Sequence, residues 1–142
     1  MKRLQYFAML CVFVTLFAGS AWGEYDKLPD PVDDVIDLGG NTYTLTTSGN
    51  LYTLNEEGKT VTIKNGTIKS TVTGAFDIIT VKKGILKLGT GLKIEAPQGA
   101  AIYVNGDNAE IIIDGAEIES ESGKENYALA TISKGNMTVI SG

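Results

Sequence analysis

The sequence predicts an all-β protein built as a single-stranded parallel β-helix (β-solenoid) of about four to five coils of about 25 residues each. Three observations carry this prediction. Glycines recur at Gly49, Gly74, Gly99 and Gly123, in steps of 25, 25 and 24 residues. Short runs of alternating apolar and polar residues are separated by Asn-Gly, Asp-Gly and Ser-Gly turn sequences. Apolar pairs with a similar step occur at Ile36/Leu38, Val61/Ile63, Leu86/Leu88, Ile111/Ile113 and Met137/Val139.

This regular spacing favours a stacked coil over an antiparallel sandwich. A sandwich does not require equal spacing, whereas equivalent side chains of successive coils must lie above one another, about 4.8 Å apart. We therefore expect the first members of the pairs to form one interior column and the second members to form another. The residues between them should point outward, because side chains alternate along a strand. They are Asp37, Thr62, Lys87, Ile112 and Thr138.

A second strand in each coil is predicted from further apolar pairs. These pairs are Tyr52/Leu54, Ile79/Val81, Ile102/Val104 and the weaker Ala130/Ile132. Alternation then places outward Thr53, Thr80, Tyr103 and Thr131. A third apolar position follows the first pair at Tyr43, Ile68 and Ile118, with Ile94 displaced by one. The gaps between pairs vary while the total stays near 25, so we expect the length variation to lie in turns.

The chain divides into three regions by composition. Residues 1–23 have a basic start, an apolar run of about 15 residues and small residues at Ala21 and Gly23, which is the layout of a secretory signal peptide cleaved before Glu24. The apolar run is short for a membrane span, which needs about 20 residues. Residues 24–35 are acidic, contain two prolines and suggest a linker or N-terminal cap. Residues 36–142 carry the repeats, and their abrupt end suggests truncation of a longer protein.

The repeats resemble right-handed parallel β-helix proteins of the pectin-lyase-like superfamily. The units VTIKNGTI and IIIDGAEI, which begin at Val61 and Ile111, carry this resemblance. It is greatest to the repeat portions of secreted bacterial adhesins and autotransporter passengers, and it covers residues 36–142. The resemblance implies right-handed winding and an exported protein. Within the superfamily, lyases use an arginine base with calcium-binding aspartates, and hydrolases combine aspartates with a histidine.

The composition after residue 23 argues against these catalytic mechanisms. This part of the chain contains no His, Arg, Cys or Trp, so we lean against an enzyme and expect no disulfide. Losing Lys2 and Arg3 with the signal leaves 10 lysines against 17 acidic residues. That negative balance argues against nucleic acid as a partner. We expect no cofactor and, once the signal is cleaved, no membrane insertion.

Two sets of carboxylates are candidate site residues. Acid–base work on a sugar would need paired carboxylates, and a hard cation would need six or more oxygen ligands. The candidates for acid–base work are Asp107, Glu110, Asp114 and Glu117. The candidates for binding a cation are Glu117, Glu119 and Glu121. A solvated, charged face explains both sets better, so we assign no catalytic, cofactor-binding or metal residue. Tyr103 with Ile112 is the predicted partner contact, because an exposed aromatic ring can stack on a sugar or anchor a protein.

The sequence favours an exported, non-catalytic module for adhesion, scaffolding or surface display that binds a glycan or protein surface. It would be secreted, periplasmic or at the cell surface of a bacterium. An open C-terminal coil would expose strand edges, so self-association through it is also expected. The alternative is the N-terminal fragment of a pectate-lyase-like polysaccharide lyase or hydrolase whose active residues lie further along the gene.

Overall fold

Every regular element in the described part of the structure is a β-strand. The computed structural model describes residues 27–72, 77–96, 101–120, 129–131 and 135–141. Its strands are β1 (Val35–Asp37), β2 (Thr42–Leu45), β3 (Tyr52–Lys64), β4 (Gly66–Ser70), β5 (Ile79–Leu88), β6 (Leu92–Ala96), β7 (Ile102–Val104), β8 (Ala109–Asp114), β9 (Glu117–Ser120), β10 (Leu129–Thr131) and β11 (Gly135–Ser141). The predicted all-β class is confirmed.

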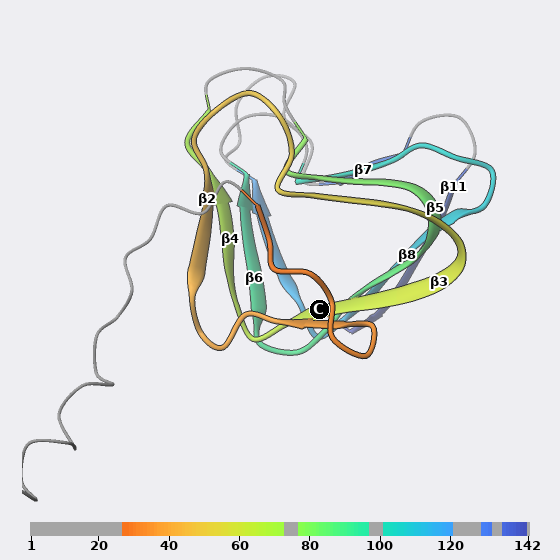
Figure 1. The fold of residues 1–142 in the computed structure, drawn as a ribbon, viewed down its shortest axis with the longest axis horizontal. Helices are drawn as coiled ribbons and strands as arrows, with labels where there is room; N and C mark the ends of the chain where they lie inside the picture. Colours follow the sequence, from red (N-terminus) through yellow and green to blue (C-terminus); the bar gives the residue numbers. More distant parts are fainter. Residues whose placement is uncertain (1–26, 73–76, 97–100, 121–128, 132–134, 142) are drawn as a thin grey trace, which may run out of the picture.

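The strands stack in parallel around a three-walled prism, seen down its axis in Figure 1. One wall is the sheet β2-β4-β6-β9. The other two walls belong to one seven-stranded sheet, because the long strands β3 and β5 bend at a corner and contribute to both. Their first halves pair in the wall of β7 and β10, and their second halves pair in the wall of β1, β8 and β11.

The prism is a parallel β-solenoid of about three turns, which confirms the predicted architecture. The four to five coils expected from the sequence include the passage from β9 to β11. Residues 121–128 and 132–134 of that passage lie outside the described part of the chain. Residues 1–23, the expected signal peptide, also lie outside it.

The predicted interior columns are present from β3 onward. Up to β8 their side chains are at most 5% exposed. The first column is Val61, Leu86, Ile111 and Met137, and the second is Ile63, Leu88, Ile113 and Val139. The outer positions between them are Thr62, Lys87, Ile112 and Thr138, also in register. Each fully buried aliphatic side chain contributes about 1.5–3 kcal/mol, so these columns dominate the stability of the fold.

The first coil departs from the predicted register by two residues. β1 places Ile36 beside Ile63 and not beside Val61, as the apolar pairs had suggested. Partners are 27 residues apart in β1 but 25 apart in β2, so the turn over residues 38–41 holds two additional residues. A shift of two residues leaves each side chain on the same face of its strand. The alternation of apolar and polar residues therefore cannot reveal this shift.

The register of β10 differs from the prediction by one residue. Leu129 and not Ala130 pairs with Ile102, and Thr131 follows at the next inner register position instead of an outer one. Ile132, the predicted partner of Ala130, lies outside the described residues. A one-residue shift exchanges the two faces of a strand.

The remaining predicted rows are confirmed. Tyr52, Ile79 and Ile102 pair in sequence, as do Leu54, Val81 and Val104. The outer row between them is Thr53, Thr80 and Tyr103. On the other wall the row is Tyr43, Ile68, Ile94 and Ile118, and the turn before β6 absorbs the displacement of Ile94.

One member of the predicted glycine column lies in the described part of the chain. Gly49 lies in the loop between β2 and β3, with a left-handed φ of +145°. Gly74, Gly99 and Gly123 lie outside the described residues. For these three glycines the corner role stays a prediction.

Candidate functional site

The segment before β1, orange in Figure 1, crosses the N-terminal end of the prism, and a hollow lies beside this segment. Leu28 anchors this segment, because its side chain is only 2% exposed and packs in the core. The Leu28 amide donates a hydrogen bond to the Leu51 carbonyl over 3.0 Å. Further along, Val32 and Val35 form an antiparallel bridge. Asp33 and Asp34 between them adopt left-handed φ values, which turn the chain into β1.

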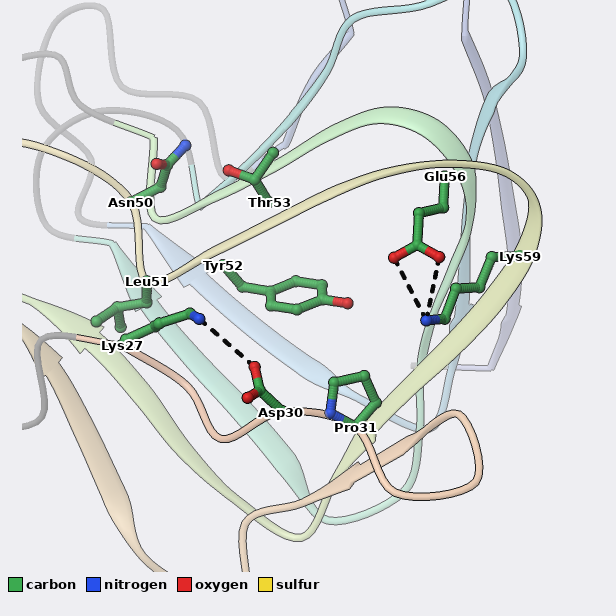
Figure 2. Close-up of a pocket in the computed structure, with 9 residues that line it drawn as sticks. All are labelled: Lys27, Asp30, Pro31, Asn50, Leu51, Tyr52, Thr53, Glu56 and Lys59. Atoms are coloured by element: carbon green, nitrogen blue, oxygen red, sulfur yellow. Dashed lines mark hydrogen bonds and ion pairs between the residues drawn. The ribbon is translucent and has the colours of Figure 1, made fainter.

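The hollow has a volume of about 630 Å³ and lies between this segment and the start of β3. Both sides supply polar groups, and Tyr52 supplies an aromatic ring that lies across the middle of the hollow (Figure 2). The lining residues are Lys27, Asp30, Pro31, Asn50, Leu51, Tyr52, Thr53, Glu56 and Lys59.

Tyr52 is half-buried because it begins β3 at the first coil. In the next coil its partner Ile79 is fully buried between neighbouring strands. Burial raises the pKa of the Tyr52 phenol above its usual 10.0, and the carboxylates of Glu56, Asp30 and Asp34 raise it further. The phenol is therefore neutral near pH 7, and it offers both a hydrogen-bond donor and an apolar ring face.

The charged side chains that line the hollow are paired with one another. Lys27 lies 3.4 Å from Asp30, and Lys59 lies 3.3 Å from Glu56, as the dashed lines in Figure 2 show. Lys59 also lies 3.9 Å from Asp34, just outside the lining. These pairs are exposed and contribute little to stability. They do leave the lining with two positive and two negative groups, and hence without net charge.

Asn50 is positioned at the rim by the neighbouring coil. Its side-chain amide donates a 2.7 Å hydrogen bond to the Thr80 hydroxyl. Thr80 occupies an outer position of β5, yet it is only 6% exposed. This contact ties the loop before β3 to the strand stacked above it, so the rim of the hollow is part of the solenoid framework.

A pH titration tests the environment of Tyr52. Because its folded-state pKa is raised, we expect the Tyr52 phenol to ionise at higher pH in the folded state than in the unfolded chain. The folded state then holds a proton that the unfolded state has lost, so stability falls as pH rises above 10. Tyr52→Phe should remove one phenol that ionises above its usual pH, followed by absorbance near 295 nm, and flatten the alkaline loss of stability. A late-titrating absorbance of the same amplitude in the variant and the original chain would contradict this assignment.

Tyr103 and Ile112, the predicted partner contacts, lie on different walls of the prism. Tyr103 is half-buried in β7 beside Thr80, and Ile112 is half-buried in β8 beside Lys87. The corner over residues 105–108 separates the two strands, which pair with different neighbours. Their role in binding stays a prediction, and the geometry offers two separate surfaces instead of one.

The carboxylates considered for acid–base work are distributed over a corner and two walls. They are Asp107, Glu110, Asp114 and Glu117. Asp114 lies 2.7 Å from the Lys87 ammonium, which holds the pKa of Asp114 below its usual value. Glu110 accepts a hydrogen bond from the Thr138 hydroxyl over 3.4 Å. Glu117 lies on β9, in another wall.

The predicted acidic row is partly observed. Glu117 and Glu119 are both exposed on β9, and Glu121 falls outside the described residues. Lys93 lies 3.1 Å from Glu119 and 3.3 Å from Glu95, so it offsets only part of the negative charge of this wall. Within the described ranges, no three His, Cys, Asp or Glu side chains are grouped so that they could hold a metal ion.

The sequence did not predict the hollow, because the repeat pattern assigns Tyr52 to an inner apolar position. The equivalent positions hold Ile79 and Ile102, so a tyrosine at the first coil was the one available signal. An aromatic residue with a polar tip suits a position that is covered on one side only. The segment around Asp30 and Pro31 carried no periodic signal.

Comparison with known proteins adds no family assignment. No protein-family model, curated protein or solved structure matches the chain. In the described part of the chain, no helix has the length and apolar character needed to cross a membrane.

Proposed function

We propose that this chain is an exported, non-catalytic β-solenoid module that binds glycans at the Tyr52 hollow and serves in adhesion or surface display. The observation that carries the proposal is the half-buried Tyr52 ring, framed by hydrogen-bonding groups in a hollow of about 630 Å³. The resemblance to pectin-lyase-like repeats of secreted bacterial adhesins supports it. So does the secretory layout of residues 1–23.

The chemistry of the lining favours an uncharged sugar unit. A sugar ring presents C–H groups that pack on an aromatic face and hydroxyls that exchange hydrogen bonds with polar neighbours. The Tyr52 hydroxyl, the Thr53 hydroxyl and the Asn50 amide supply such neighbours. An anionic or cationic ligand would have to disrupt the ion pairs of Lys27 or Lys59 to find a counter-charge. The ligand class is therefore a neutral glycan, held by stacking and hydrogen bonds.

A binding assay with three variants tests this function. On an array of neutral and anionic glycans, we expect the chain to retain neutral glycans, with Tyr52→Ala weakening binding at least tenfold because the stacking surface is lost. Tyr52→Phe keeps the ring and should retain most of the affinity. Tyr103→Ala is the matched control, because it removes the same side chain from another surface.

Each result of this assay has one reading. Loss of binding in Tyr103→Ala but not in Tyr52→Ala would overturn the hollow as the site and restore the surface predicted from the sequence. Selective binding of anionic glycans would overturn the neutral ligand class. Cleavage of polygalacturonate by the purified chain would overturn the non-catalytic assignment in favour of the lyase or hydrolase alternative.

A further inference from the structure

Two Asn-Gly pairs lie at turns of the solenoid. Asn65-Gly66 joins β3 to β4, and Asn105-Gly106 begins the corner over residues 105–108, between β7 and β8. An Asn-Gly pair can rearrange spontaneously, because glycine has no side chain to keep its backbone nitrogen away from the side-chain carbonyl carbon of the asparagine. The rearrangement requires both groups to be free to approach each other. The two pairs therefore differ in reactivity if the fold holds them differently.

The Asn65-Gly66 pair is held at both reacting groups. The Asn65 side-chain amide donates a 3.0 Å hydrogen bond to the Asp37 carboxylate. The Gly66 backbone amide donates a 2.9 Å hydrogen bond to the Gly91 carbonyl. Hydrogen bonds from the Gly39 amide and from Asn65 lower the pKa of Asp37, so its carboxylate is ionised near pH 7. Both contacts must break before the Gly66 nitrogen can reach the Asn65 side chain.

The Asn105-Gly106 pair is held only outside its reacting groups. The Asn105 backbone amide donates a 2.8 Å hydrogen bond to the Val81 carbonyl, and the Gly106 carbonyl accepts one from the Ala109 amide over 3.2 Å. The Asn105 side chain is exposed. Among the described residues, no hydrogen bond involves this side chain or the Gly106 amide. The nucleophilic nitrogen and its target carbon are therefore free to meet.

This corner belongs to an inner coil of the stack. β7 and β8 both pair with β5 on one side, and they pair with β10 and β11, respectively, on the other. The sheet pairing therefore fixes the strands on both flanks of the corner. The exposure of Asn105 comes from its place on the outside of the prism.

We propose that Asn105-Gly106 is a self-modification site of the folded chain, at which asparagine converts to aspartate and isoaspartate. The Gly106 nitrogen attacks the Asn105 Cγ atom, so that an N–Cγ bond forms and the Cγ–Nδ2 bond breaks. The proton of the Gly106 amide ends on the departing nitrogen, which leaves as ammonia. Water then opens the cyclic imide. Opening at Cγ gives aspartate, and opening at the backbone carbonyl gives isoaspartate, with water as the one co-reactant.

The two products have different consequences for the corner. Both place a negative charge two residues before Asp107. Isoaspartate also lengthens the main chain by one carbon between β7 and β8. Gly106 packs so closely on the coil below that an added methyl group would overlap the Lys82 carbonyl. We therefore expect the isoaspartate form to be the less stable one. The modification depends on this corner alone and stands independently of the glycan proposal.

Peptide mapping by mass spectrometry, during incubation of the full chain at mildly alkaline pH, is the test. We expect Asn105 to convert at least about tenfold faster than Asn65, because two hydrogen bonds must break at Asn65 first. Asn65 is the matched control within the same molecule. In concentrated urea the two sites should convert at similar rates, because the fold no longer protects Asn65.

Two variants separate the contributions of the two sites. Asn105→Gln should abolish the early acidic species seen by isoelectric focusing, because a glutamine would have to close a larger ring. Asp37→Ala removes the acceptor of the Asn65 side chain, so it should accelerate conversion at Asn65 and leave the rate at Asn105 unchanged. Circular dichroism of both variants reports whether the β-fold is retained.

Three outcomes would overturn the proposal. In the folded chain, conversion at Asn65 that equals or exceeds conversion at Asn105 would remove Asn105 as the preferred site. A rate difference that persists unchanged in urea would assign the preference to the local sequence and not to the fold. An undiminished early acidic species in folded Asn105→Gln would place the modification elsewhere in the chain.

Discussion

Gly84→Ala is expected to lower the free energy of unfolding by on the order of 3 kcal/mol. Gly84 sits at the corner where β5 bends, with a left-handed φ of +87°. A methyl group there would lie 2.5 Å from the Glu56 carbonyl oxygen and 2.7 Å from the Lys59 carbonyl oxygen. Both oxygens belong to the backbone and cannot move aside as a flexible side chain could. The strain of the left-handed conformation and the overlap therefore add.

The corner around Gly84 also supports the candidate site. In β3 the matching corner is longer, because Asn55 pairs with Lys83 while Thr60 pairs with Ile85. The intervening residues, which include Glu56 and Lys59 of the hollow, bow outward and pass close to Gly84. We therefore expect Gly84→Ala to displace this part of the lining and to weaken glycan binding along with stability.

Gly58→Ala is the matched control for this prediction. Gly58 has a similar φ of +74°, but an added methyl group would meet nothing within 4 Å. Gly58→Ala should lower the free energy of unfolding only by the cost of a left-handed backbone for alanine, about 1 kcal/mol. Equilibrium unfolding in urea, followed by circular dichroism, measures both variants. Equal losses of stability in the two would show that the close approach at Gly84 is not the cause.

Ile111→Ala is expected to destabilise the fold by about 3–4 kcal/mol. Ile111 is fully buried in the middle of an interior column, between Leu86 below and Met137 above. Removing three carbons there leaves a cavity that neighbouring coils cannot fill, because their spacing is set by the backbone hydrogen bonds of the sheet. The resulting loss combines lost burial with the cavity term.

Ile112→Ala provides a control on the adjacent residue of the same strand. Ile112 has the same side chain, but it points outward and is half-buried. Its truncation should cost about 1 kcal/mol or less. Equilibrium unfolding in urea measures both variants. The variant with the larger loss of unfolding free energy identifies the interior face of β8. A larger loss for Ile112→Ala than for Ile111→Ala would refute the register on which the solenoid is built.

The candidate site illustrates the limits of reading side chains along a repeat. Tyr103 and Ile112 could be assigned outer positions because strand alternation is local. Their separation onto two walls depends on the corner over residues 105–108, whose bend has no periodic signature. The Tyr52 hollow forms because the segment holding Lys27 and Asp30 crosses the prism. The spacing of the repeats does not predict this crossing.

The sequence by itself determined the all-β class, the parallel stacking and the composition of the core columns from β3 onward. These follow because stacked coils force equivalent residues into contact, so burial imposes a period on the chain. Only the tertiary structure decided the register at the two ends. There a shift of two keeps Ile36 inside, so the alternation of apolar residues does not reveal it, and a shift of one pairs Leu129 with Ile102. The hollow likewise depends on where Leu28 packs, a single long-range contact that leaves no repeating pattern in the chain.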